Sequence, residues 1–329
     1  MNIPAPSETS YHDAEGNFCN PPGSPKRQST RADMRKFLFD GLTGRRNNSP
    51  DVPREHVLSD SDAAKGWDAR QGDKLQWLGH SAFRWKLDDT VLISDPLLTD
   101  RASPFSFIGP KRYVPSPLKP EQAAADIVLI SHNHYDHLDL RTLARLPNKE
   151  TVQVIVPLGN SASVRSAGIS NVIELDWHQS ITIRDLKITL LPAIHFSARW
   201  TNDRNKTLWG GYAVESSQHK IYMSGDTAYH PDAFKKIGER YGPFDYGLIA
   251  IGAYEPRSIM IASHVTPEEA VQIGRDVKAK TLVGHHWGAL VLTPENPFEP
   301  PVRFKAAAKT AGYPDQDTWI MKVGETRAF

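Results

Sequence analysis

One segment in the middle of the chain constrains the fold more than any other. An apolar run over residues 127–130 is followed, within the six residues 132–137, by His132, His134, Asp136 and His137. Backbone that leaves a strand can turn sharply, so side chains that would alternate along the strand can converge at its end. A polar loop that only caps a sheet is the alternative, but three clustered imidazoles would repel one another once protonated. We therefore expect a strand that ends in a metal site.

The cysteine content decides which kind of metal site this can be. Cys19 stands alone beside 13 histidines, so neither an internal disulfide nor a thiolate zinc finger can be built. The ligands must therefore be imidazoles and carboxylates, a set that zinc and related ions accept.

Three later apolar runs also end in residues that can bind a metal. These residues are His195 after 186–191, Asp226 after 220–223, and His285 with His286 after 281–284. Gly225 would let the backbone turn and bring Asp226 close to an ion. A lone residue of this kind is more often structural, but three such strand ends after one dense cluster form a pattern.

Apolar runs and helical patterns alternate from residue 75 to the C-terminus. The predicted strands are 90–94, 126–131, 152–156, 186–191, 209–214, 220–223, 246–251, 281–284 and 318–323, and the predicted helices are 140–146, 161–167, 232–241, 266–278 and 302–311. The helix at 266–278 opens with a capping box, because Thr266 stands at the cap, Pro267 at the first helical position and Glu269 three residues after the cap. The alternation predicts an α/β domain over residues 75–329.

Residues 1–74 differ from the rest and predict an irregular N-terminal arm, because they are rich in Pro, Ser, Asn and charge. Within the arm, residues 26–46 hold seven basic and two acidic side chains. One face of a short helix here would carry Met34, Phe37, Leu38 and Leu42. Such a basic amphipathic helix could lie on an anionic bilayer surface, or it could dock on the main body with its basic side in solvent.

Charge and hydropathy narrow the class of protein. The 39 basic and 38 acidic residues give a net charge of +1, whereas proteins that coat nucleic acid usually carry a basic surplus. No apolar run approaches the roughly 18 residues of a membrane-spanning helix, and the N-terminus lacks the pattern of a secretory signal. We expect a cytoplasmic protein that binds no nucleic acid and associates with a membrane only peripherally.

The order of the motifs resembles the metallo-β-lactamase superfamily: His-x-His-x-Asp-His at 132–137, then a distant His, a Gly-Asp-Thr and a late His. Neighbouring phrases are similar to one branch, the N-acyl-phosphatidylethanolamine-hydrolysing phospholipase D family. They include Trp77-Leu-Gly-His80-Ser81, Asp95-Pro96, Glu174-Leu-Asp-Trp177, Gly252-Ala-Tyr-Glu-Pro-Arg257 and His264-Val-Thr-Pro-Glu-Glu-Ala270. The similarity covers nearly everything from Leu75 to the C-terminus, with a weaker echo at 11–21.

The resemblance implies the αββα sandwich of the superfamily, an α/β fold with two facing mixed sheets flanked by helices. It also implies a homodimer and two zinc ions per chain. The implied ligands are His132, His134 and His195 for the first ion, Asp136, His137 and His286 for the second, and Asp226 as the bridge. His285 competes with His286, but the family's ligand directly precedes the Trp-Gly pair, here Trp287-Gly288.

The same resemblance implies an enzyme, a zinc-type phospholipase D whose substrate is a phospholipid at a membrane surface. A hydroxide shared by the two ions would attack the phosphorus of N-acylphosphatidylethanolamine, release N-acylethanolamine and leave phosphatidic acid. The predicted catalytic residues are Asp226, Asp136 and His264, and the predicted substrate contacts are Tyr135 and His264. His80 and Asp139 are expected to orient ligands. The alternative keeps the two-metal site in a lactonase or soluble phosphodiesterase of the same superfamily.

Overall fold

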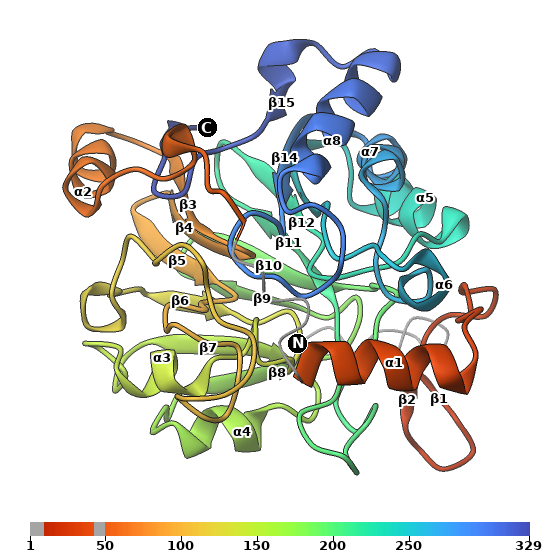
Figure 1. Cartoon of the computed structure of the whole chain (residues 1–329). Helices are drawn as coiled ribbons and strands as arrows, with labels where there is room; N and C mark the ends of the chain where they lie inside the picture. The colour runs from red at the N-terminus through yellow and green to blue at the C-terminus, as the bar shows by residue number, and fades with distance from the viewer. Residues whose placement is uncertain (1–9, 43–49) are drawn as a thin grey trace.

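Two seven-stranded mixed sheets face one another at the centre of the computed structural model, which describes residues 10–42 and 50–329 (Figure 1). The first sheet has the order β16 (Thr326–Ala328), β3 (Lys74–Gly79), β4 (Ala82–Leu87), β5 (Thr90–Ser94), β6 (Ile127–Leu129), β7 (Gln153–Pro157) and β8 (Val172–Leu175). The second has the order β15 (Thr318–Trp319), β14 (Ala279–His285), β13 (Phe244–Ala250), β12 (Lys220–Met223), β11 (Gly211–Glu215), β10 (Leu186–Leu191) and β9 (Ser180–Ile183). Strands β5 to β8 and β12 to β15 pair in parallel.

Helices cover the outer faces of both sheets (Figure 1). On the side of the first sheet lie α3 (Leu140–Ala144) and α4 (Ser161–Ser166), and on the side of the second lie α5 (Pro231–Arg240), α7 (Pro267–Asp276) and α8 (Glu299–Thr310). The remaining elements are β1 (Tyr11–His12), β2 (Phe18–Cys19), α1 (Arg31–Leu42), α2 (Asp60–Ala69), α6 (Arg257–Met260) and short 3₁₀ turns at Arg54–His56, Pro120–Gln122 and Asp315–Asp317. This arrangement confirms the predicted αββα sandwich. None of the described helices is both long and apolar enough to cross a membrane.

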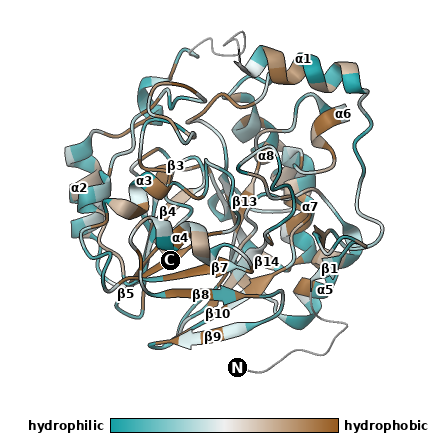
Figure 2. Cartoon of the chain, turned by 90° about the horizontal axis from the view of Figure 1, so that it is seen from below, coloured by the Kyte–Doolittle hydropathy of each residue, from teal (hydrophilic) through white to brown (hydrophobic). Residues whose placement is uncertain are grey.

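The space between the sheets is filled by large apolar side chains from both of them. Trp85 and Phe83 of β4 and Tyr212 and Ile221 of the second sheet are fully buried, and hydrophobic residues, drawn in brown in Figure 2, make up much of the strands. Tyr212 also reaches across the sandwich, since its hydroxyl donates to the carbonyl oxygen of Ile130 (2.8 Å). The core therefore fixes the position of the loop that follows β6.

Most predicted elements are present with small shifts at their ends. Strands β5, β10 and β12 have the predicted bounds, and α7 begins with the predicted capping box of Thr266 and Glu269. The predicted helix in the arm is present as α1, although Leu42's side chain and residues 43–49, including Arg45 and Arg46, lie outside the described part. The proposed division at residues 74 and 75 stays a prediction.

The sequence reading omitted β3 and α2, which pack together. Polar residues interrupt the apolar pattern of β3, yet they are buried because α2 supplies their partners: Lys74 Nζ donates to the carbonyl oxygens of Trp67 and Arg70, and Gln76 Nε2 donates to that of Ala63 (2.9 Å). The arm is therefore helical over residues 60–69, where an irregular segment was expected.

A buried arginine ties the loop after β5 to the first sheet. The Arg112 guanidinium donates to the carbonyl oxygens of Leu78 (2.8 Å), Leu97 (2.7 Å) and Val114 (3.0 Å). Burial lowers the pKa of Arg112 to about 10, so the side chain stays charged at neutral pH.

We predict that Arg112→Met lowers the free energy of unfolding by about 3 kcal/mol or more, because three buried carbonyl oxygens lose their donor. Urea titration followed by tryptophan fluorescence measures this loss. The control is Arg145→Met, which removes an exposed ion pair with Glu121 and should cost less than about 1 kcal/mol. An effect of Arg112→Met no larger than that of the control would contradict this role.

Candidate metal centre

The seven predicted ligands lie at one edge of the sandwich, because each follows the end of a strand. The first sheet delivers its ligands after β6, and the second sheet delivers the others after β10, β12 and β14. Gly225 makes the turn before Asp226 with a φ of +59°, and a Cβ there would come within 2.8 Å of the carbonyl oxygen of Gly210 and the Cβ of Ser131. Only glycine fits this position.

Three residues that directly follow strand ends have a left-handed backbone conformation. His80 follows β3, Asp95 follows β5, and His286 follows β14, and their φ values are 55°, 40° and 62°. This left-handed conformation is uncommon for residues other than glycine and clusters at functional sites. Here it turns side chains from both sheets toward the same edge.

The first predicted group of ligands is compact. The candidate ligand atoms of His132, His134 and His195 lie within 4.8 Å of one another. His134 Nδ1 is 2.8 Å from His132 Nε2 and 3.3 Å from His195 Nε2. Burial lowers the pKa of His195 to about 3 and that of His134 to about 4. Both rings are therefore neutral at pH 7, as a metal ligand must be.

The second group is equally close and includes one residue that was expected only to orient ligands. Asp136, His137 and His286 share a cluster of candidate ligand atoms with His80. The His80 ring lies tilted against His286, with centroids 4.2 Å apart, and its Nε2 donates to Asp136 Oδ2 (2.9 Å). His80 thus orients Asp136 as predicted.

Asp226 stands between the two groups. Its Oδ2 lies 3.2 Å from His137 Nε2 and 3.0 Å from His286 Nε2. The same oxygen lies 4.0 Å from His132 Nε2 and 3.9 Å from His195 Nε2. One carboxylate oxygen is therefore near imidazoles of both groups, which is the position that a bridging ligand requires.

Unpaired polar atoms show that the site fits metal ions. Asp226 Oδ1 and His286 Nδ1 are buried without a hydrogen-bond partner, and such buried atoms normally have one. Burial opposes the charged imidazolium, yet the carboxylates of Asp226 and Asp136 raise the pKa of His286 to about 9 and that of His137 well above its usual range. The carboxylates thus keep these two imidazoles protonated. Because imidazole nitrogens and carboxylate oxygens suit divalent cations, a metal ion could take the place of these protons.

Several contacts fix which ring nitrogen faces the centre. His137 Nδ1 donates to Asp95 Oδ2 (2.8 Å), and His195 Nδ1 donates to the carbonyl oxygen of Ser263 (2.8 Å). The Nε2 atoms of both rings are therefore left for a metal, as is usual when an outer partner holds the other nitrogen. Asp95 is itself held by the backbone N–H and the hydroxyl of Ser131, both at 2.7 Å.

The backbone of one ligand is held by the N-terminal arm. The Asn20 amide pairs with both backbone groups of His195: Nδ2 donates to its carbonyl oxygen (2.8 Å) and Oδ1 accepts from its N–H (3.0 Å). Asn20 Oδ1 also accepts from Trp209 Nε1 (3.1 Å). Sequence reasoning gave no role to Asn20, because no local pattern links residues 175 positions apart.

Sequence reasoning also missed Asp95 and misplaced Asp139. The strand-end pattern contained the signal for Asp95, which is the first residue after β5. Asp139 was expected to orient ligands, but its carboxylate instead accepts from Arg141 N (3.1 Å), Thr99 Oγ1 (2.6 Å) and Thr142 Oγ1 (2.8 Å). It caps α3, as short acidic side chains do at helix starts.

The remaining predicted residues lie at different distances from the centre. His264 Nδ1 is 4.0 Å from Asp226 Oδ2, and burial lowers its pKa to about 3. Tyr135 is turned aside, because its hydroxyl donates to the carbonyl oxygen of Arg199 (2.8 Å) and the Arg199 guanidinium covers its ring. His285 points to Ser81 Oγ (3.2 Å) in the core, so His286 is the histidine of the pair that faces the centre.

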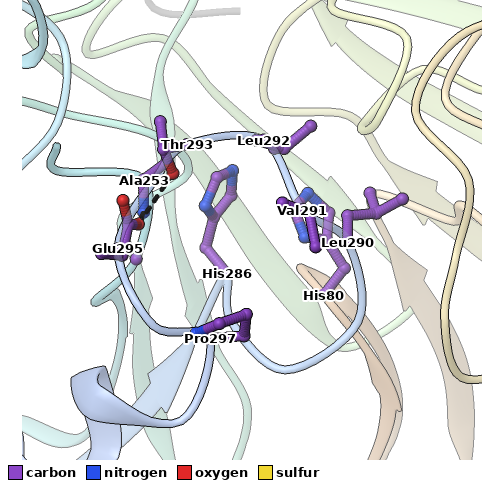
Figure 3. Close-up of a pocket in the computed structure, with 10 residues that line it drawn as sticks. His80, Ala253, His286, Leu290, Val291, Leu292, Thr293, Glu295 and Pro297 are labelled. Atoms are coloured by element: carbon purple, nitrogen blue, oxygen red, sulfur yellow. Dashed lines mark hydrogen bonds between the residues drawn. The ribbon is translucent and has the colours of Figure 1, made fainter. Parts of the chain in front are cut away.

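Two hollows adjoin the metal centre. The smaller lies behind His286, whose ring stands between Glu295 with Thr293 on one side and His80 on the other (Figure 3). The larger has a volume of about 570 Å³ and reaches the ligands His134, Asp136, His195, Asp226 and His286 as well as His264. Its other walls come from the arm, including α1, from α6, and from the loops that hold Phe196, Arg204, Ala253 and Leu292. A ligand in this cavity would therefore touch both the arm and the metal centre.

Comparison with known proteins agrees with this fold. A family model described as a beta-lactamase superfamily domain matches residues 90–287. The isothiocyanate hydrolase from Delia radicum gut bacteria superposes with a TM-score of 0.61 at 19% identity, covering 78% of this chain and 99% of that one. The chain belongs to the metallo-β-lactamase superfamily, and it is a metal-dependent hydrolase.

Curated relatives narrow the assignment to one branch. The chain is 37% identical over 282 residues to N-acyl-phosphatidylethanolamine-hydrolyzing phospholipase D 1 of Caenorhabditis elegans, covering 80% of this chain and 79% of that protein. It is 33% identical over 260 residues to the mitochondrial N-acyl-phosphatidylethanolamine-hydrolyzing phospholipase D of Saccharomyces cerevisiae, covering 77% and 55% respectively. Within the superfamily it belongs to this phospholipase D family, which confirms the resemblance seen in the sequence.

We predict that Asp95→Asn weakens metal binding about 10- to 100-fold, the usual effect of removing an outer partner of a ligand. Competition with a chromogenic chelator measures the dissociation constant. The matched control is Asp139→Asn, which touches no ligand and should change that constant by less than about threefold. Equal losses in the two variants would show that Asp95 has no special contact with the metal centre.

Metal uptake should also release protons. His286 and His137 have raised pKa values in the metal-free protein, so both carry protons at pH 7 that a metal must displace. The apparent metal affinity should rise with pH through the pKa of His286, which is about 9. Calorimetry in two buffers of different ionisation enthalpy measures the release, which we expect to be about two protons at pH 7. Metal binding without proton release at pH 7 would contradict these protonation states.

Proposed function

We propose that this protein uses two zinc ions to hydrolyse N-acylphosphatidylethanolamine, a membrane phospholipid, to N-acylethanolamine and phosphatidic acid. The observation that carries the proposal is the cavity of about 570 Å³ that joins the metal centre to an apolar wall. Its volume lies within the usual range of small-molecule sites. The names of the relatives in Caenorhabditis elegans and Saccharomyces cerevisiae support the choice of this phospholipid.

The lining of the cavity suits the two parts of a phospholipid. Metal-centre residues form part of this lining, where a phosphodiester would bind. The apolar side chains are Met34, Phe37 and Leu38 of α1, Ile259 and Met260 of α6, and Leu292. A small hydrophilic substrate would gain nothing from this wall, whereas an acyl chain would bury apolar surface against it.

The ligands divide between the two ions as the geometry groups them. His132, His134 and His195 would hold one, Asp136, His137 and His286 the other, and Asp226 would join them. When bound, ions of this kind lower the pKa of water and offset the negative charge of a phosphate. Burial raises the cost of the carboxylate anions, but the imidazoles of His137 and His286 hold the pKa of Asp226 well below its usual range, so Asp226 is available as an anionic ligand.

His264 is the cavity residue best placed to contact the substrate phosphate. It begins the segment before α7, lines the cavity, and lies beside His195 and Asp226. Because burial keeps its ring neutral at pH 7, it can donate one hydrogen bond to a phosphate oxygen or to a leaving alkoxide. We assign it the substrate-binding and proton-transfer role.

Helix α1 gives the cavity a route to a membrane. It lies beside α6 in both views of the molecule (Figures 1 and 2), and Leu38 and Phe39 are 54% and 52% exposed at its surface. The same helix carries Arg31 and Arg35, which are exposed. Apolar and cationic side chains on one helix favour an anionic bilayer surface, so we propose peripheral docking through α1.

The function is tested with vesicles that contain N-acylphosphatidylethanolamine and with mass-spectrometric detection of N-acylethanolamine. The zinc-loaded protein should release it, and Asp226→Asn should lower the rate roughly 100-fold or more, because the two ions lose their shared ligand. The control is Asp232→Asn, an exposed aspartate in the first turn of α5, which should leave the rate unchanged. A zinc-loaded protein that cleaves a lactone or a soluble diester but not these vesicles would favour the alternative enzyme of the same superfamily.

A further inference from the structure

Two arginines from different parts of the chain line the large cavity. Arg27 belongs to the arm and precedes α1, whereas Arg204 belongs to the loop that follows His195. Both line the same cavity as the ligands His134 and His195. The fold therefore brings two permanent positive charges to the space where a substrate would lie.

Ring contacts fix Arg204 close to the metal centre. Its guanidinium lies over the Phe196 ring at 4.2 Å from the centroid, a favourable cation–π distance. The Phe196 ring in turn lies 4.5 Å from His134 and 4.9 Å from His195, measured between centroids. One aromatic ring thus separates the Arg204 charge from two predicted ligands.

Neither guanidinium has an acidic partner or a hydrogen bond among residues 10–42 and 50–329. Other arginines around the site do: Arg199 donates to the carbonyl oxygens of Asn133 and Leu138, and Arg257 pairs with Glu269. Arg27 and Arg204 instead repel each other, since partial burial and the charge of Arg27 both lower the pKa of Arg204. Two like charges at one cavity wall would be stabilised by an anion between them.

We propose that Arg27 and Arg204 form a phosphate-binding subsite of this cavity, which holds anionic oxygens of a phospholipid beside the metal centre. The proposal rests on the proposed function for the identity of that lipid. Planar guanidinium groups suit phosphate oxygens because they donate in pairs. The phosphate has two sources in this reaction, the diester of the substrate and the monoester of the phosphatidic acid product. The subsite also explains how the enzyme would prefer an anionic diester to a neutral lactone.

The test removes one charge at a time in the full, zinc-loaded protein. Arg27→Gln and Arg204→Gln are compared with Arg54→Gln, which removes an exposed arginine that does not line the cavity. The substrate is a short-chain N-acylphosphatidylethanolamine below its micellar concentration, so attraction to a membrane plays no part. Each cavity variant should raise KM about tenfold, the size expected for a charged hydrogen bond, with kcat within about twofold of the parent, and Arg54→Gln should change neither.

Two further ligands complete the design. Calorimetry with dihexanoyl phosphatidic acid should show about tenfold weaker binding to the cavity variants, while hydrolysis or binding of a neutral lactone should not change. If the cavity variants bind only the substrate more weakly, the subsite holds the phosphodiester. If they bind only the product more weakly, it holds the phosphate monoester. Binding of both phospholipids as tight as in the parent, or an equal loss with the lactone, overturns the subsite. If the protein proves inactive on N-acylphosphatidylethanolamine, the proposed function fails, and calorimetry with phosphatidic acid and the lactone still tests the subsite: weaker binding of phosphatidic acid alone supports it, and unchanged binding overturns it.

Discussion

The approach of the Asp226 carboxylate to imidazoles from both sheets is the interaction on which the rest of the structure depends. Its Oδ2 lies within 4.0 Å of ring nitrogens of His132, His137, His195 and His286. Buried charges are costly unless they are paired or bind metals, so this cluster exists only because two sheets hold it at one edge. The strand ends at this edge, the left-handed residues after them and Gly225 bring these side chains within a few ångströms of one another.

The N-terminal arm forms part of the active site. Asn20 holds both backbone groups of His195, and the side chains of α1 form a wall of the cavity that reaches the metal centre. Of the two readings left open by the amphipathic pattern, docking on the main body accounts for the cavity side of α1, and docking on a bilayer remains a proposal for its exposed side. Because one segment holds His195 and forms a wall of the cavity, the shape of the cavity and the geometry of the metal centre are physically linked.

Sequence reasoning predicted the structural features that depend on residues close together in the chain. The ligands after 127–130 and the capping box of α7 depend on neighbours a few residues apart, so a pattern can show them. The choice of His286 over His285 needed the family resemblance, because spacing cannot tell which of two adjacent rings faces the core. Asn20 and the buried Lys74 depend on partners supplied by distant or separate elements, which no local pattern contains. Asp139 was misread because a helix cap and an outer partner of a metal ligand have the same residue type.

The proposed two-metal centre requires one carboxylate that joins two metal ions held by ligands from both sheets. Anomalous diffraction from zinc-loaded crystals, collected on both sides of the zinc absorption edge, would locate each ion. We expect two peaks per chain, one among His132, His134 and His195 and the other among Asp136, His137 and His286, with Asp226 contacting both. A single peak at full zinc loading, or two peaks with Asp226 bound to only one of them, would contradict this two-metal centre.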